Sequence, residues 1–198
     1  MSAPSWSERA YADSRTYLAS RAEVVRTLGP PLVHGDVVLD LACGDGGLAA
    51  FLPEQRYVGL DGSAEMVGAA HARGVEAVHA DLNEYVPPQP VAATTIFRAI
   101  YYARDRRALL ERIAGYTSKK LVFDLNPRQY RLVDVRADLR AEGFDRLDVR
   151  PFFVPQTRAL PVPALAALRA LEQVGPLATL VLRARFTLIC AAWRSAGS

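Results

Sequence analysis

Three short apolar segments of this sequence each end in an aspartate, and the aspartates recur at an almost constant interval. Asp40, Asp61 and Asp81 lie 21 and 20 residues apart. A glycine-rich run, Gly-Asp-Gly-Gly at 44–47, follows the first of them. Apolar segments that alternate with helical patterns favour a parallel sheet with helices on both faces. Because the carboxyl ends of neighbouring parallel strands share one edge, we expect the three carboxylates to line one crevice.

Hydrophobic periodicity predicts the remaining elements. Strands are expected at 36–41, 57–60, 75–79, 92–100, 121–123, 147–154 and 185–193. Helices are expected at 11–28, after the glycine run as far as Leu52, and at 63–73, 106–116, 132–142, 164–173 and 177–183. The pattern predicts an α/β protein with a doubly wound sheet in one domain spanning 1–198.

Composition excludes several classes of protein. The chain has 198 residues, of which 51% are hydrophobic, so it is not a disordered tail. Two cysteines, Cys43 and Cys190, form no disulfide framework and suggest a reducing compartment. The polar N-terminus and the lack of an uncharged run of about 18 residues argue against a signal peptide and a membrane span. A cytoplasmic protein is expected.

The basic residues do not indicate a nucleic-acid partner. The net charge is only +3, and the arginines are interspersed with acidic residues, as on a solvated surface. Arginine supplies 22 of the 24 basic residues, which suggests the coding bias of a GC-rich genome and an expected bacterial source. The histidines His34, His71 and His79 show no ligand spacing, so we expect no metal.

The glycine run after Asp40 resembles a nucleotide-binding corner. Glycines let the backbone approach a ligand, and the end of a strand beside a helix N-terminus offers free N–H groups. A glycine turn alone also occurs for conformational reasons, and Asp61 alone could cap a helix near Ser63. Three aspartates at the ends of consecutive strands are harder to explain by caps.

The segments LDLACGDGG, VGLDGSAEMVGAA and HADLNE resemble the first three motifs of the class I S-adenosylmethionine-dependent methyltransferases. The resemblance covers residues 36–125. It implies a Rossmann-like seven-stranded, mostly parallel sheet with an antiparallel last strand, and S-adenosylmethionine as cofactor. Asp40–Gly46 would wrap the methionine portion, Asp61 would bind the ribose hydroxyls and Asp81 the adenine amino group. The cofactor-binding residues implied are Asp40, Ala42, Cys43, Gly44, Gly46, Asp61, Gly62, Met66, Asp81, Leu82, Arg98 and Tyr17.

Two features qualify the resemblance. Ala42 stands where the motif usually has its first glycine, a mild departure. A dinucleotide-binding dehydrogenase would also use a glycine turn, but its pattern needs glycine at position 49, which is Ala49. Methyl transfer is therefore preferred.

The substrate side of the crevice is less defined. Arg98, Tyr101 and Tyr102 follow the expected fourth strand, where Arg98 would face the cofactor carboxylate or an anionic substrate. One of the two tyrosines is expected in the core, because adjacent strand residues face opposite ways. Asp124 and Asn126 are expected near the mouth of the crevice. Substrate-binding residues are predicted to be Tyr11, Tyr101, Tyr102 and Asn126. Tyr102, Asp124 and Arg98 are the candidates for catalysis, and no residue demands that role.

Two segments distinguish this chain. The N-terminal helical segment, 1–30, with Tyr11, Tyr17 and Arg21, could form a wall of the crevice. A helical insertion at 155–184 is interpreted as core or a homodimer interface, or as a lid that makes the pocket hydrophobic. The sequence thus predicts methyl transfer to a small, hydrophobic or aromatic molecule. The alternatives are a non-catalytic cofactor-binding scaffold or regulatory protein, or an RNA or protein substrate.

Overall fold

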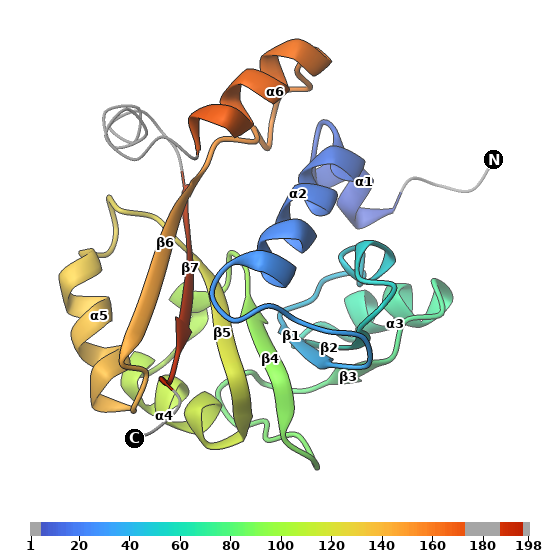
Figure 1. Ribbon diagram of the computed structural model, residues 1–198. Helices are drawn as coiled ribbons and strands as arrows, with labels where there is room; N and C mark the ends of the chain where they lie inside the picture. Colours follow the sequence, from blue (N-terminus) through green and yellow to red (C-terminus); the bar gives the residue numbers. More distant parts are fainter. Residues whose placement is uncertain (1–4, 173–186, 196–198) are drawn as a thin grey trace.

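The computed structural model describes residues 5–172 and 187–195 (Figure 1). A seven-stranded sheet runs through the centre of the protein in the order β3-β2-β1-β4-β5-β7-β6. The strands are β1 Val37–Leu41, β2 Arg56–Asp61, β3 Ala77–His79, β4 Val91–Ile96, β5 Thr117–Leu125, β6 Arg146–Phe152 and β7 Thr187–Trp193. The helices are α1 Trp6–Ala10, α2 Ser14–Thr27, α3 Ala64–Ala72, α4 Arg106–Tyr116, α5 Leu132–Ala141 and α6 Val162–Leu171.

The register aligns the carboxyl ends of the central strands. Leu41, the last residue of β1, pairs with Leu60 of β2 and with Ile96 of β4 in parallel ladders. β7 is antiparallel to both of its neighbours, β5 and β6. The predicted mostly parallel sheet with an antiparallel last strand is confirmed.

Two hydrophobic clusters fill the space on the two faces of the sheet. Alternation along β5 shows the division, because Leu121 and Phe123 belong to one cluster and Val122 belongs to the other. The first cluster includes residues of α4 and α5, and the second includes residues of α2. These helices accordingly cover opposite faces (Figure 1).

Side chains fix the positions of the helix ends. Ser63 caps α3, with its side chain accepting a hydrogen bond from the Met66 N–H at 3.4 Å. Asp105 caps α4 through the N–H groups of residues 107 and 108. At the C-terminal end of α2, the buried Lys120 Nζ donates to the carbonyl of Leu28 at 2.7 Å. Burial lowers the pKa of Lys120 to about 8.

Two of the predicted elements were wrong. The helix expected after the glycine run is only a 3-10 helix, Ala49–Phe51, because just nine residues lie between Gly46 and the start of β2. β4 ends at Ile96, and Tyr101 and Tyr102 lie in a 3-10 helix, Ile100–Tyr102. The alternation of a strand does not apply there, so both tyrosines are exposed, at 47% and 61%.

The inserted segment is described only in part. The expected helix at 164–173 is present as α6, whereas the expected helix at 177–183 lies outside the described residues. No residue of α6 is buried, and Val162 is 80% exposed. Arg169 forms an ion pair with Glu23 of α2. Among the described residues, α6 therefore lies on the surface, with Leu165 packed against the second hydrophobic cluster.

Candidate active site

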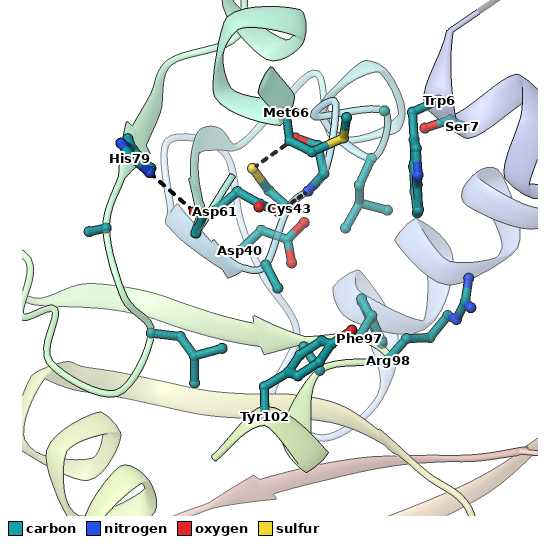
Figure 2. Close-up of a pocket in the computed structure, with 18 of the residues that line it drawn as sticks. Trp6, Ser7, Asp40, Cys43, Asp61, Met66, His79, Phe97, Arg98 and Tyr102 are labelled. Atoms are coloured by element: carbon teal, nitrogen blue, oxygen red, sulfur yellow. Dashed lines mark hydrogen bonds between the residues drawn. The ribbon is translucent and has the colours of Figure 1, made fainter. Parts of the chain in front are cut away.

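A cavity of about 760 Å³ opens at the carboxyl ends of β1, β2 and β4 (Figure 2). Its volume is typical of small-molecule sites, which measure roughly 300–1,000 Å³. The lining residues are Trp6, Ser7, Tyr11, Leu18, Arg21, Asp40, Ala42, Cys43, Gly44, Gly47, Leu48, Asp61, Gly62, Met66, His79, Ala80, Asp81, Leu82, Asn83, Phe97, Arg98, Ala99, Tyr101 and Tyr102.

Asp40 lies near the end of β1, at the base of the cavity. Its carboxylate accepts hydrogen bonds from the Tyr57 hydroxyl at 2.6 Å and from the Thr95 hydroxyl at 2.5 Å. Burial raises the pKa of Asp40 from 3.8 to about 6, although the two hydroxyl donors oppose the shift. Neighbouring strands therefore hold Asp40 in one orientation, and its charge is sensitive to a bound cation.

The glycine-rich turn keeps the shape that glycine favours, even where the residue is alanine. Ala42 has φ 62°, and Gly44 and Gly46 have φ 59° and 69°. A left-handed backbone at alanine costs about 1–2 kcal/mol, so the surrounding turn enforces it. The departure from glycine at Ala42 leaves the turn intact. Gly46 lies behind the cavity wall, where a Cβ would be within 3.0 Å of Val75.

Asp61 joins the glycine turn to the start of α3. One carboxylate oxygen accepts the Gly44 N–H at 2.8 Å, and the other accepts the Ser63 N–H at 2.9 Å. Each oxygen retains a lone pair for a further donor, so the carboxylate can still accept from a pair of hydroxyls. Figure 2 shows Asp61 beside Cys43 and His79 on the cavity wall.

Asp81 lies at the far end of the cavity, after β3. Its Oδ1 accepts from the backbone N–H and the side-chain amide of Asn83, both at 2.8 Å, and its Oδ2 pairs with Arg104. The hydrogen bond from the Asn83 backbone lowers the Asp81 pKa. Asp81 remains an ionised acceptor beside Leu82, a combination that suits a flat ring with an amino group.

Helix α1 covers one side of the cavity and is attached to the glycine turn. Ser7 donates to the buried carboxylate of Asp45 through its N–H, at 3.0 Å, and through its hydroxyl. These hydrogen bonds lower the Asp45 pKa against the effect of burial. Trp6 projects from α1 into the cavity, on the opposite side from Asp61 (Figure 2). A Cβ at Gly47 would lie 2.6 Å from the Ser7 hydroxyl, so only glycine permits this contact.

The part of the cavity wall that follows β4 is aromatic and basic. Tyr101 and Tyr102 are in contact, with ring centroids 4.5 Å apart, and the Tyr102 ring points inward in Figure 2. Arg98 has φ 56°, a strained conformation for arginine. Its backbone N–H donates to the Asp124 carboxylate at 2.6 Å. This hydrogen bond turns the chain at the end of β4, so that Phe97 and Arg98 both line the cavity.

Arg21 of α2 also lines the cavity, although it is only 3% exposed. Its Nη2 donates to Asp124 at 2.8 Å. The guanidinium carbon lies 4.7 Å from the centre of the Tyr17 ring and 4.4 Å from that of Phe97. Asp124 is therefore a structural partner of both arginines.

The structure brings most of the predicted site residues together. Of the predicted cofactor- and substrate-binding residues, Gly46, Tyr17 and Asn126 do not line the cavity. Asp124, expected near its mouth as a candidate for catalysis, is instead 6% exposed, with both oxygens hydrogen-bonded. Asn126 is exposed in the turn after β5, and Tyr17 stacks on Tyr11 behind the wall.

Several lining residues were not predicted from the sequence. No local pattern marks these residues, because their positions in the cavity wall depend on contacts between distant segments. They are Trp6, Ser7, Phe97 and, in its role at the wall, Arg21. Asp45, which accepts from Ser7 but does not line the cavity, did carry a signal, since an acidic residue inside a glycine turn requires a donor when it is buried. No group of three or more potential metal ligands lies together in residues 5–172 and 187–195. Within the same residues, no helix is long and apolar enough to cross a membrane.

Comparisons with known proteins find similarity to methyltransferases. Residues 38–120 match the family described as "Methyltransferase domain". The curated trans-aconitate 2-methyltransferase of Azoarcus sp. (strain BH72) is 33% identical over 137 residues, which are 64% of this chain. The chain spans about half the length of that protein, with 53% of it covered.

Two solved structures share the fold. The putative methyltransferase in a complex with the Haloferax volcanii Trm112 methyltransferase activator has 22% identity and a TM-score of 0.65, with 95% of this chain and 93% of that chain covered. Magnesium protoporphyrin IX methyltransferase from Synechocystis PCC 6803, solved with S-adenosylmethionine bound, has 16% identity and a TM-score of 0.62. The match covers 98% of this chain and 86% of that chain.

Proposed function

We propose that this chain is a class I S-adenosylmethionine-dependent methyltransferase and that it transfers the methyl group of S-adenosylmethionine to a small organic acceptor. One observation carries the proposal. Asp40, Asp61 and Asp81, from the ends of three adjacent strands, line a single cavity. In this order along the sheet, they would bind the methionine, ribose and adenine portions of the cofactor.

The residues present fit that cofactor. Asp61 retains acceptor capacity for two ribose hydroxyls, and Asp81 lies beside the apolar Leu82 for the adenine. Gly62 has open space around it, with no atom within 4 Å of a Cβ position. The glycine turn and the buried Asp40 line the part of the cavity that would hold the methionine portion. The cofactor supplies an electrophilic methyl group on a sulfonium.

The chain then has to orient an acceptor and exclude water. An acceptor held in line, roughly 3 Å from the methyl carbon, reacts without further activation unless it must lose a proton. Trp6 and Tyr11 on one side, with Tyr101 and Tyr102 on the other, offer apolar surface for a small hydrophobic or aromatic molecule. Tyr102 and Arg98 remain proposed contacts of the acceptor.

The inserted segment and the location of the protein stay predictions. The exposed apolar residues of α6 suit either a lid or a homodimer interface. The proposed substrate is a small molecule and no nucleic acid is expected; the relative from Azoarcus is named for the small molecule trans-aconitate. A cytoplasmic, bacterial enzyme remains our expectation.

The proposal is tested by turnover. Purified protein is incubated with S-adenosylmethionine and a panel of aromatic and aliphatic small molecules, and S-adenosylhomocysteine is measured as the product. We expect formation above background with at least one member, and its loss in Asp61→Ala. Binding of the cofactor without transfer to any acceptor would favour the alternative of a non-catalytic scaffold. Turnover on RNA or a protein in place of every small molecule would overturn the proposed substrate class.

A further inference from the structure

Asn83, in the loop after β3, uses its whole side-chain amide in hydrogen bonds. Its Nδ2 donates to Asp81 Oδ1 at 2.8 Å and to the Tyr102 carbonyl at 3.3 Å. Its Oδ1 accepts the backbone N–H of Arg104 at 2.9 Å. Only one orientation of the amide satisfies these two acceptors and this donor. One half-buried side chain therefore joins the loop after β3 to the segment that follows β4.

The two segments that Asn83 joins line different parts of the cavity. Asp81 and Leu82 line the part that the proposed function gives to the adenine ring. Tyr101 and Tyr102 line the part that it gives to the acceptor. A contact between the two parts makes the position of the tyrosines depend on what binds at the carboxylate.

The Asp81 carboxylate has one place left for a ligand, next to this contact. Its Oδ1 accepts both the backbone N–H and the Nδ2 of Asn83, each at 2.8 Å, which fills both lone pairs. Its Oδ2 pairs with Arg104 and, within the described part of the chain, retains one lone pair. A donor on a ligand therefore binds the same carboxylate that holds the Asn83 amide.

The tyrosine segment, residues 98–104, is attached near both of its ends. At its start, the Arg98 N–H donates to Asp124 at 2.6 Å. Near its end, the backbone bonds to Asn83 on either side of residue 103. Ile100 is buried in the core between these points, but the two tyrosines are largely exposed. Their position consequently depends on the attachments of the backbone more than on packing.

We propose that Asn83 couples the adenine side of the cavity to Tyr101 and Tyr102, so that a cofactor bound at Asp81 fixes the surface that receives the acceptor. The inference rests on the proposed function for the identity of that cofactor. A donor on Asp81 holds the carboxylate, the carboxylate holds Nδ2 of Asn83, and the amide holds the backbone beside the tyrosines. Coupling between two sites is reciprocal, so a bound acceptor also strengthens cofactor binding. Asn83 is thus a positioning residue.

Two substitutions separate the contacts of Asn83. Asn83→Ala removes all three side-chain hydrogen bonds. Asn83→Asp keeps an oxygen for the Arg104 N–H but places a second oxygen, without a proton, against Asp81 and the Tyr102 carbonyl. The matched control is Glu84→Ala, which breaks the exposed ion pair between Glu84 and Arg104 at 3.0 Å and leaves Asn83 unchanged. Thermal melting confirms that each variant is folded.

Hydrogen exchange of residues 99–105 reports the coupling directly, because the Arg104 N–H is one of the groups bound to Asn83. Saturating S-adenosylhomocysteine should slow this exchange about threefold or more in wild type and in Glu84→Ala. In Asn83→Ala and Asn83→Asp it should have little effect on residues 99–105, while residues 40–47 of the glycine turn still become protected. S-inosylhomocysteine, which has an oxygen in place of the adenine amino group, should slow the exchange in wild type less than half as much.

Turnover gives an independent readout with any acceptor that the panel supplies. Asn83→Ala should raise the KM for the acceptor about fivefold or more and change the KM for S-adenosylmethionine less than about twofold. A merely structural role would reduce the amount of active enzyme and leave both KM values unchanged.

Three results would overturn the inference. Exchange at 99–105 that slows as much in Asn83→Ala as in wild type would show that Asn83 does not carry the coupling. Equal slowing by S-inosylhomocysteine would show that the amino group on Asp81 is not its source. Protection of the glycine turn with no change at 99–105 in wild type would show two independent sides. Failure of the proposed function is distinguishable, because calorimetry would then detect no binding of S-adenosylhomocysteine to folded wild type, and the inference would fall with it.

Discussion

Asp124 accepts the side chain of Arg21 at 2.8 Å and the backbone N–H of Arg98 at 2.6 Å. One buried carboxylate thereby connects α2 to the end of β4. It holds one arginine against two aromatic rings and the other in a left-handed conformation. The wall of the cavity on this side depends on Asp124, even though Asp124 does not line it.

The first prediction concerns this ion pair. Asp124→Ala leaves the Arg21 charge buried without a partner, so we expect the free energy of unfolding to fall by about 3–5 kcal/mol. Urea denaturation followed by circular dichroism measures the change. Glu76→Gln, which breaks the exposed pair with Arg56, should change the free energy by no more than about 0.5 kcal/mol. Equal effects of the two substitutions would contradict the role given to Asp124.

The second prediction concerns Asp40 and pH. Its pKa in the folded protein, about 6, exceeds the ordinary 3.8, so the folded state holds a proton that the unfolded chain releases between these values. The contribution of Asp40 to stability therefore decreases as pH rises from about 4 to 6. We expect the free energy of unfolding of wild type, minus that of Asp40→Asn, to decline across this window in urea titrations.

The same group should couple ligand binding to pH. Ionised Asp40 favours the ammonium group at the amino-acid end of S-adenosylhomocysteine, so affinity should increase from pH 5 to pH 7 in wild type. The affinity of Asp40→Asn should vary much less over that range. His79 also lines the cavity, so His79→Gln serves as the control and should retain the increase. If the affinity of Asp40→Asn increased with pH as much as that of wild type, the pH dependence would belong to another group.

The third prediction uses the two tryptophans. Trp6 lines the cavity. The Trp193 ring instead packs beside Gly29, where an added Cβ would lie 2.9 Å from it. S-adenosylhomocysteine should therefore change the fluorescence of Trp193→Phe about as much as that of wild type. Trp6→Phe should show little change while calorimetry still detects binding. A full fluorescence response in Trp6→Phe would place the ligand elsewhere.

The fourth prediction compares two glycines. A Cβ at Gly47 would meet the Ser7 hydroxyl at 2.6 Å and Leu18 at 3.0 Å, so Gly47→Ala should displace α1. We expect a loss of about 1–3 kcal/mol in stability and weaker binding of S-adenosylhomocysteine. Gly68→Ala, exposed on α3 with no atom within 4 Å, should instead stabilise the protein by up to about 1 kcal/mol. Thermal melting of the pair tests the packing of α1 on the glycine turn.

The sequence predicted the part of the site that local patterns encode. Asp40, Asp61 and Asp81 each follow an apolar run, and parallel pairing places such ends at one edge. The wall formed by α1 and α2 was only suggested. Its contacts join Ser7 to Asp45 and Arg21 to Asp124, pairs 38 and 103 residues apart. Periodicity carries no information about such pairs.

The errors in the predicted fold have local physical causes. The span 92–100 reads as one apolar strand, but the hydrogen bond from Arg98 to Asp124 turns the chain after Ile96. Tyr101 and Tyr102 consequently share the cavity side instead of facing opposite ways. The side chain of Asp124 was expected to face a substrate because its burial against Arg21 is a tertiary contact, which the sequence of β5 does not reveal.

Calorimetric titration of S-adenosylhomocysteine into wild type, Asp61→Asn and the exposed control Glu76→Gln tests the central claim most directly. We predict micromolar binding to wild type and to Glu76→Gln. Asp61→Asn should bind at least tenfold more weakly, a difference of about 1.4 kcal/mol. Absence of binding to folded wild type would contradict the account, as would unchanged affinity in folded Asp61→Asn.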